Sequence, residues 1–176
     1  MRKRLPESQS ILQVYAVIAV LVAGWTITAF LWKLSSWLLV LNLGEIFTVF
    51  SYGMAANFLE SLIILFILLA ASALLPATLL RDDFVVRGTI LSMGIIGAMM
   101  AFLGAQVHFG SEVGLKLLLP PLVILLLMAC VLGSLPTSPL LRSAAAWLSD
   151  RVIIFLFILV PLFVVLSGYV IIRNIS

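Results

Sequence analysis

Long runs of apolar residues constrain the fold of this chain more than any other feature of its sequence. The first runs from Ile11 to Trp32, and its 22 residues would cover about 33 Å as a helix at about 1.5 Å per residue. That length exceeds the hydrocarbon thickness of a bilayer, which is about 30 Å. We therefore predict a membrane-spanning helix here, because the apolar core of a cleaved signal peptide is shorter.

Four further apolar runs predict membrane-spanning helices, so that the five predicted spans lie at residues 11–32, 58–80, 88–107, 117–132 and 152–172. The chain is 64% hydrophobic and 10% charged, with a mean hydropathy of +1.32. Soluble domains are roughly 45–50% apolar and about 25% charged. These features predict an all-α fold, a bundle of five transmembrane helices that forms a single integral membrane domain over residues 1–176.

Two segments outside these spans predict helices that lie in the membrane interface. Residues 36–54 are largely apolar but include Glu45, and they could instead form a sixth span. Residues 138–148 have Pro139 at a favourable first helical position, Trp147 at a level that suits lipid headgroups, and leucine and alanine at helical spacing. This second pattern is typical of a short amphipathic helix on a membrane surface.

The distribution of basic residues favours five spans over six. With five spans and a cytoplasmic N-terminus, seven basic residues lie inside and three outside, whereas a sixth span would place five on each side. Basic residues accumulate on the cytoplasmic side of membrane proteins. We therefore expect a cytoplasmic N-terminus and an outer C-terminus, with a bacterial inner membrane as the expected location.

Four polar side chains between the first two predicted spans form the candidate polar cavity: Asn42, Glu45, Asn57 and Glu60. Asn57 and Glu60 have the spacing of a capping box, which predicts a helix that begins at Asn57 and places Glu60 near the membrane boundary. Glu45 could pair with Lys33. Alternatively, the four side chains line one cavity that binds a proton, a cation or a basic ligand, because carboxylates inside membranes are costly and often functional.

Small residues recur along the third predicted span and form a candidate helix-packing face. Small side chains let helix backbones approach closely in lipid, so this face predicts packing against another span, self-association or docking to a partner. Its members are Gly94, Gly97, Ala98, Ala101, Gly104 and Ala105.

The remaining chemically capable residues do not form a recognisable site. His108 is the single histidine and Cys130 the single cysteine, so a histidine-rich zinc site and a site of several cysteines are excluded. The sequence RDDFVVR at residues 81–87 predicts a solvated turn in which acidic and basic side chains pair. Pro161 predicts a kink in the last span. No phosphate-binding loop, nucleophile motif or basic patch with interleaved aromatic residues is present.

These observations favour a non-catalytic membrane protein that acts as an accessory subunit, a scaffold or an anchor of a membrane complex. The alternative is a subunit that binds or transports a small solute through the polar cavity near Glu45 and Glu60. An enzyme is the least favoured class, and we expect no cofactor and no nucleic acid. The expected partners are the lipid bilayer and either a membrane protein or a second copy, bound through the third span.

Overall fold

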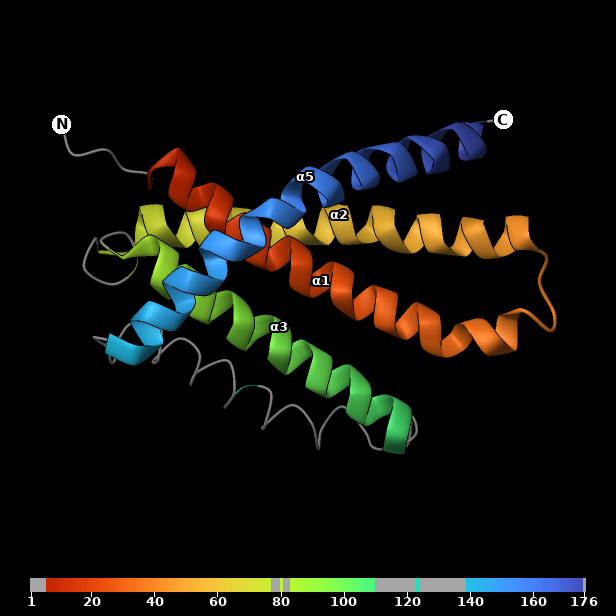
Figure 1. Cartoon of the computed structure of the whole chain (residues 1–176), viewed down its shortest axis with the longest axis horizontal. Coiled ribbons are helices and arrows are strands. Elements are labelled where there is room, and N and C mark those ends of the chain that lie inside the picture. The colour runs from red at the N-terminus through yellow and green to blue at the C-terminus, as the bar shows by residue number, and fades with distance from the viewer. Residues whose placement is uncertain (1–5, 77–79, 81–82, 110–122, 124–138, 176) are drawn as a thin grey trace.

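The computed structural model describes residues 6–76, 80, 83–109, 123 and 139–175, and for residues 101–103 and 105–109 it describes the backbone alone. Within these ranges the fold is all-α, as predicted. Its four helices are α1 (Ser8–Trp37), α2 (Leu43–Leu74), α3 (Phe84–Phe109) and α5 (Pro139–Ile175) (Figure 1). Three of them, α1, α2 and α5, are long and apolar enough to cross a membrane, which indicates a membrane location.

The predicted bundle of five transmembrane helices is confirmed only in part. The fourth predicted span, residues 117–132, lies outside the described residues except for Val123, and Cys130 falls outside them as well. Four helices are therefore seen in the part of the chain that the structure describes. The other predicted spans all fall largely within helices, but two of those helices extend well beyond the predicted bounds.

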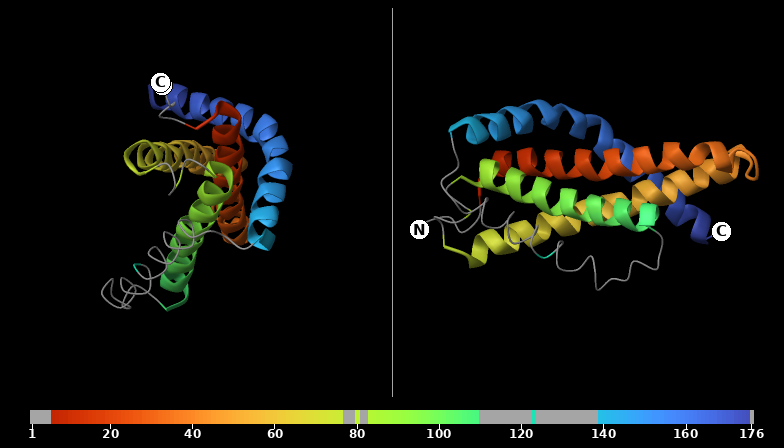
Figure 2. Two further views of the ribbon diagram at one scale, coloured as in Figure 1. Left: turned by 90° about the vertical axis from the view of Figure 1, so that its left-hand side faces the viewer. Right: turned by 90° about the horizontal axis from the view of Figure 1, so that it is seen from below.

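The central element of the bundle is α1, which packs against α2, α3 and α5 (Figure 2). Every residue from Val14 to Ala19 is buried, so this part of α1 is covered on all sides, as expected for a helix that is apolar all round. On one side its residues join a core cluster with Met54 of α2 and Phe163 of α5. On another side they join Leu68 of α2 and Leu91 of α3.

A capping box at Asn42 starts α2. The backbone N–H of Glu45 donates to Asn42 Oδ1 over 2.9 Å, and the backbone N–H of Asn42 donates to Glu45 Oε2 over 2.8 Å. The helix ends at Leu74 because Pro76 follows, and a residue that precedes proline is disfavoured in helical conformation. Leu75 is accordingly extended, with φ −82° and ψ 156°.

This single helix corrects the predictions for residues 36–54 and 58–80. Residues 43–54 form the first part of α2 and continue without a break through Asn57, so Asn57 lies inside the helix and does not cap it. The chain reverses between α1 and α2 in a short turn at residues 38–42, which is held by backbone bonds such as Leu41 N–H to Trp37 O. The 32 residues of α2 span about 48 Å, more than a hydrocarbon core requires.

A second correction concerns α5, which is continuous from Pro139 to Ile175. Pro139 is its first residue, as predicted, but residues 139–148 are not a separate interfacial helix. Pro161 stands inside α5, and the helix bends along its length (Figure 2). Proline removes one backbone hydrogen bond and thereby permits such a bend. Four buried residues face the bundle at spacings of three and four: Leu156, Leu159, Phe163 and Leu166.

The helix directions divide the molecule into two ends (Figure 1). The start of α1, the end of α2 and the starts of α3 and α5 lie at one end, which we call the N-terminal end. The turn at residues 38–42 and the last residues of α3 and α5 lie at the other, which we call the opposite end. The end of α3 and the start of α5 thus lie at different ends of the bundle (Figure 1).

Candidate functional site

Glu60 lies near the middle of α2, seventeen residues after Leu43 and fourteen before Leu74. At about 1.5 Å per residue it is about 26 Å from one end of the helix and about 21 Å from the other. Its side chain is exposed, and among the described residues it makes no hydrogen bond and no ion pair. The prediction that Glu60 lies one turn inside a helix start at Asn57 is therefore corrected, since α2 begins at Leu43, about four turns before Asn57.

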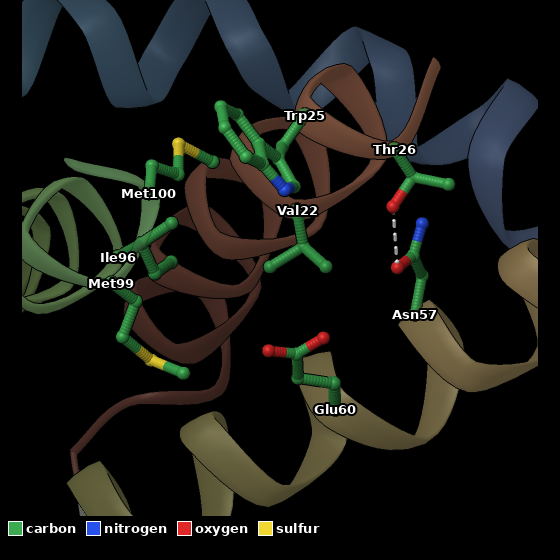
Figure 3. A pocket seen from close by; sticks show the side chains of 8 residues that line it. All are labelled: Val22, Trp25, Thr26, Asn57, Glu60, Ile96, Met99 and Met100. Carbon is green, nitrogen blue, oxygen red and sulfur yellow. Dashed lines mark hydrogen bonds between the residues drawn. The ribbon is translucent and has the colours of Figure 1, made fainter. Parts of the chain in front are cut away.

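The carboxyl group of Glu60 faces a groove between α2 and α3. Both helices pack against α1 and contact each other little. By groove we mean the place between α2 and α3, over α1, that is marked by a pocket lined from all three helices. Figure 2 shows the arrangement of the three helices. A small pocket of about 40 Å³ opens into it, and Figure 3 shows the Glu60 side chain directed into this pocket. The lining residues come from all three helices: Val22, Trp25, Thr26, Asn57, Glu60, Ile96, Met99 and Met100.

Asn57 is the buried polar residue of this pocket, with 4% of its surface exposed. Thr26 Oγ1 donates a hydrogen bond to Asn57 Oδ1 over 2.9 Å, and Asn57 Nδ2 lies 3.8 Å from Met54 Sδ (Figure 3). Its side chain is therefore satisfied within the bundle, which makes its place inside α2 tolerable. The hydrogen bond from Thr26 links α1 to α2 near the middle of both helices.

The surroundings of the Glu60 carboxyl group are mostly apolar. Thr26 donates its only hydroxyl proton to Asn57. The other lining side chains are those of Val22, Trp25, Ile96, Met99 and Met100, of which only Trp25 has a hydrogen-bond donor, its indole N–H (Figure 3). A pocket of about 40 Å³ has room for about two or three water molecules, and so for a small ion.

The structure divides the candidate polar cavity predicted from the sequence into two places. Asn57 and Glu60 line the pocket together. Asn42 and Glu45 form the capping box at the start of α2, and the twelve residues from Glu45 to Asn57 correspond to about 18 Å along the helix. The Asn42–Glu45 pair therefore has a structural role at the opposite end, and the carboxylate of Glu45 bonds to the backbone instead of pairing with Lys33.

The candidate helix-packing face of α3 is only partly used within the described bundle. Ala98 is buried and Gly94 half-buried, whereas no atom lies within 4 Å of a side chain built at Gly97 or Gly104. The side chains of Ala101 and Ala105, like that of His108, lie outside the description. The close approach of α3 to α1 occurs instead at Gly88, where an added Cβ would stand 3.1 Å from Val14 Cγ2.

A polar cluster that the sequence analysis missed joins α5 to α2 at the opposite end. Arg173 Nη1 donates to Thr48 Oγ1 over 2.6 Å and to Tyr169 Oη over 3.1 Å. Tyr52 Oη donates to Asn174 Oδ1 over 2.9 Å. The spacing of four between Thr48 and Tyr52 was a usable signal, but it lay in a segment predicted to be interfacial. We assign this cluster a structural role.

The ion pair seen at the N-terminal end is not between two side chains of the turn at residues 81–87, as was predicted. Asp83, just before α3, pairs with Arg142 of α5, so the partner comes from another helix. Arg81 and Asp82 lie outside the described residues. Within the described ranges, no group of three or more histidine, cysteine, aspartate or glutamate side chains is placed to hold a metal ion.

Comparison with known protein families, with curated proteins and with solved structures finds no match to this chain. A function is therefore inferred from the pocket itself. Its distinguishing element is a carboxyl group, Glu60, that lies halfway along an apolar helix and opens into a groove between two helices.

Proposed function

We propose that this protein is a non-catalytic component of a membrane complex, an accessory or scaffold subunit whose groove between α2 and α3 receives part of a partner. The observation that carries this proposal is the position of Glu60. It stands halfway along α2, it is exposed, and the described residues offer it no hydrogen-bond or ion-pair partner.

The free-energy cost of this carboxyl group depends on where it would lie in a bilayer. If α2 crosses the membrane, a hydrocarbon core of about 30 Å includes Glu60 wherever it is placed along the about 48 Å of the helix. An ionised side chain such as aspartate costs about 2.5–3.5 kcal/mol at the centre of the core by insertion measurements. A protonated carboxyl group also needs a hydrogen-bond partner there. A partner that covers the groove would remove this cost.

The charge distribution supports the proposed orientation, with a cytoplasmic N-terminus, an outer C-terminus and a bacterial inner membrane as the location. Arg87, Arg142 and Arg151 lie toward the N-terminal end of the bundle, whereas Lys33 and Arg173 lie toward the opposite end. Single cysteines at positions 83 and 174 in a Cys130→Ala background would test this orientation. Labelling of position 83 by a membrane-impermeant reagent from outside would refute it.

Site-specific photo-cross-linking in cells tests the accessory role. A photoreactive amino acid replaces Met99, which lines the pocket, and in a matched control it replaces Phe157, which is 81% exposed on α5. We expect a discrete cross-linked protein from position 99 and only lipid from position 157. Cross-links from position 99 to lipid alone, or to a second copy alone, would overturn the accessory role.

A second candidate function is binding or transport of a proton or an inorganic cation. It is favoured by the oxygen atoms of Thr26, Asn57 and Glu60 around one pocket. The volume of about 40 Å³ suits a species of about the size of a few water molecules. This candidate predicts ion-driven flux in proteoliposomes that Glu60→Gln abolishes. Absence of flux in the wild-type protein would exclude it.

A further inference from the structure

We propose that the partner segment in the groove between α2 and α3 is a transmembrane helix that carries a lysine or arginine near the middle of its span, paired with Glu60. This inference rests on the proposed function and specifies the chemistry of the partner. Three features of the site support it: the charge at Glu60, the position of Glu60 along α2 and the exposed surface around it.

The missing charge is positive. Thr26 donates its hydroxyl proton to Asn57, and the amide group of Asn57 lies against Met54. Trp25 also lines the pocket, but its indole N–H is a neutral donor and cannot neutralise a carboxylate. None of the described lining residues is basic, and the sequence has no lysine, arginine or histidine between residues 117 and 141, which include the fourth predicted span. A basic side chain on a partner would supply the charge that the described residues do not.

A transmembrane helix can present a cation at the level of Glu60. Wherever a hydrocarbon core of about 30 Å is placed along α2, Glu60 lies inside it. A headgroup amine stays at the membrane surface, whereas a lysine on a transmembrane helix can be placed at any depth. Another helix is therefore the occupant that suits this position.

The available surface has the pattern of a helix-packing face. Ile63, Ile67 and Leu74 lie three, seven and fourteen residues after Glu60, so that all four share one side of α2. They are exposed by 58%, 58% and 86%, respectively. On α3, Gly97 has open space beside it, which would let a neighbouring backbone approach closely. The groove is thus bordered by an apolar side of α2 that carries one acidic residue, Glu60, near the middle of the helix.

Synthetic transmembrane peptides test the pairing directly. The probe is a leucine–alanine helix of about 22 residues with one central lysine, and its controls have leucine at the centre or the lysine moved seven residues toward one end. Binding to the full-length protein in phosphatidylcholine vesicles is measured by energy transfer between a dye on the protein and a dye on the peptide. We expect the central-lysine peptide to bind at least tenfold more tightly than either control.

Two protein variants make the result specific to Glu60. Glu60→Gln should reduce the preference for central lysine to less than twofold, and Glu60→Lys should reverse it in favour of a peptide with a central glutamate. Glu45→Gln, which changes the other carboxylate of α2 at the helix start, should leave the preference unchanged. Helical content by circular dichroism and elution volume in detergent confirm that each variant is folded.

Equal binding of the lysine and leucine peptides to the wild-type protein would overturn this inference. If photo-cross-linking at position 99 still captured a membrane protein, the accessory role would stand and only the basic partner residue would fail. If both experiments failed, the proposed function itself would fall with the inference.

Discussion

The close approach of α3 to α1 at Gly88 leads to a prediction whose size can be worked out from the structure. Gly88→Ala adds a Cβ atom that would lie 3.1 Å from Val14 Cγ2 and 3.3 Å from Val14 Cγ1. Val14 is fully buried, so its side chain has little room to move aside. Gly97 lies on the same helix and is the matched control, because no atom lies within 4 Å of a Cβ added there.

The two substitutions share one energy term and differ in another. Alanine is favoured over glycine inside a helix by about 1 kcal/mol, and this gain applies to both positions. Overpacking of a filled site costs about 1–3 kcal/mol, and this cost applies at Gly88 alone. We therefore expect Gly97→Ala to stabilise by up to about 1 kcal/mol and Gly88→Ala to destabilise by about 1 kcal/mol, so that the difference measures the steric contact.

A double-mutant cycle with Val14→Ala identifies the contact partner. Val14→Ala alone removes two buried methyl groups and should cost about 2 kcal/mol. In that background Gly88→Ala meets no obstacle and should become stabilising, which corresponds to a coupling energy of about 1–3 kcal/mol. The assay is reversible unfolding in mixed detergent micelles, with helicity followed by circular dichroism. If Gly88→Ala stabilised the protein as much as Gly97→Ala in the presence of Val14, the argument for close packing at Gly88 would be refuted.

Three further predictions follow from single contacts, each read by the same unfolding assay unless stated. Thr26→Val removes the hydrogen bond to buried Asn57 and should lower the free energy of unfolding by about 1–2 kcal/mol. Thr28→Val removes only a bond to the backbone of its own helix and should change that free energy by less than about 0.5 kcal/mol. Equal effects of the two substitutions would contradict the role of Asn57. Asn42→Ala removes the capping box of α2 and should cost about 1 kcal/mol, and unchanged stability would show that the cap is dispensable. Pro161→Ala restores the missing backbone donor and should straighten α5, which would lengthen the distance between spin labels near its two ends; an unchanged distance would assign the bend to packing.

Several features of the fold could be predicted because they depend on local properties of the chain. Apolar runs longer than a bilayer is thick predict membrane helices wherever they occur, and this reasoning located α1 and the central parts of α2, α3 and α5. The first residue of α5 followed from the preference of proline for the first turn. The long extensions of α2 and α5 beyond the predicted spans were missed because hydropathy reports membrane crossing, whereas a helix continues until a cap or a proline ends it.

The pocket was predictable only in part. Asn57 and Glu60 were singled out from their polarity in an apolar setting, but they were grouped with Asn42 and Glu45, which lie at the opposite end of the bundle. The contributions of Trp25 and Met99 were not foreseen, because neither residue is unusual in a membrane helix. Only the packing of α1 against both α2 and α3 brings these side chains to one place.

The start of α2 separates what the sequence by itself determined from what the tertiary structure decided. Apolar composition determined that the chain forms long helices suited to a membrane, since burial of apolar groups in lipid needs no specific partner. The sequence contains two Asn-x-x-Glu capping patterns, at residues 42–45 and 57–60, which local rules cannot rank. The structure uses the first, because Thr26, thirty-one residues away, satisfies the amide of Asn57 inside the bundle. Asn57 is thereby free to lie within the helix, and Glu60 is carried to its middle.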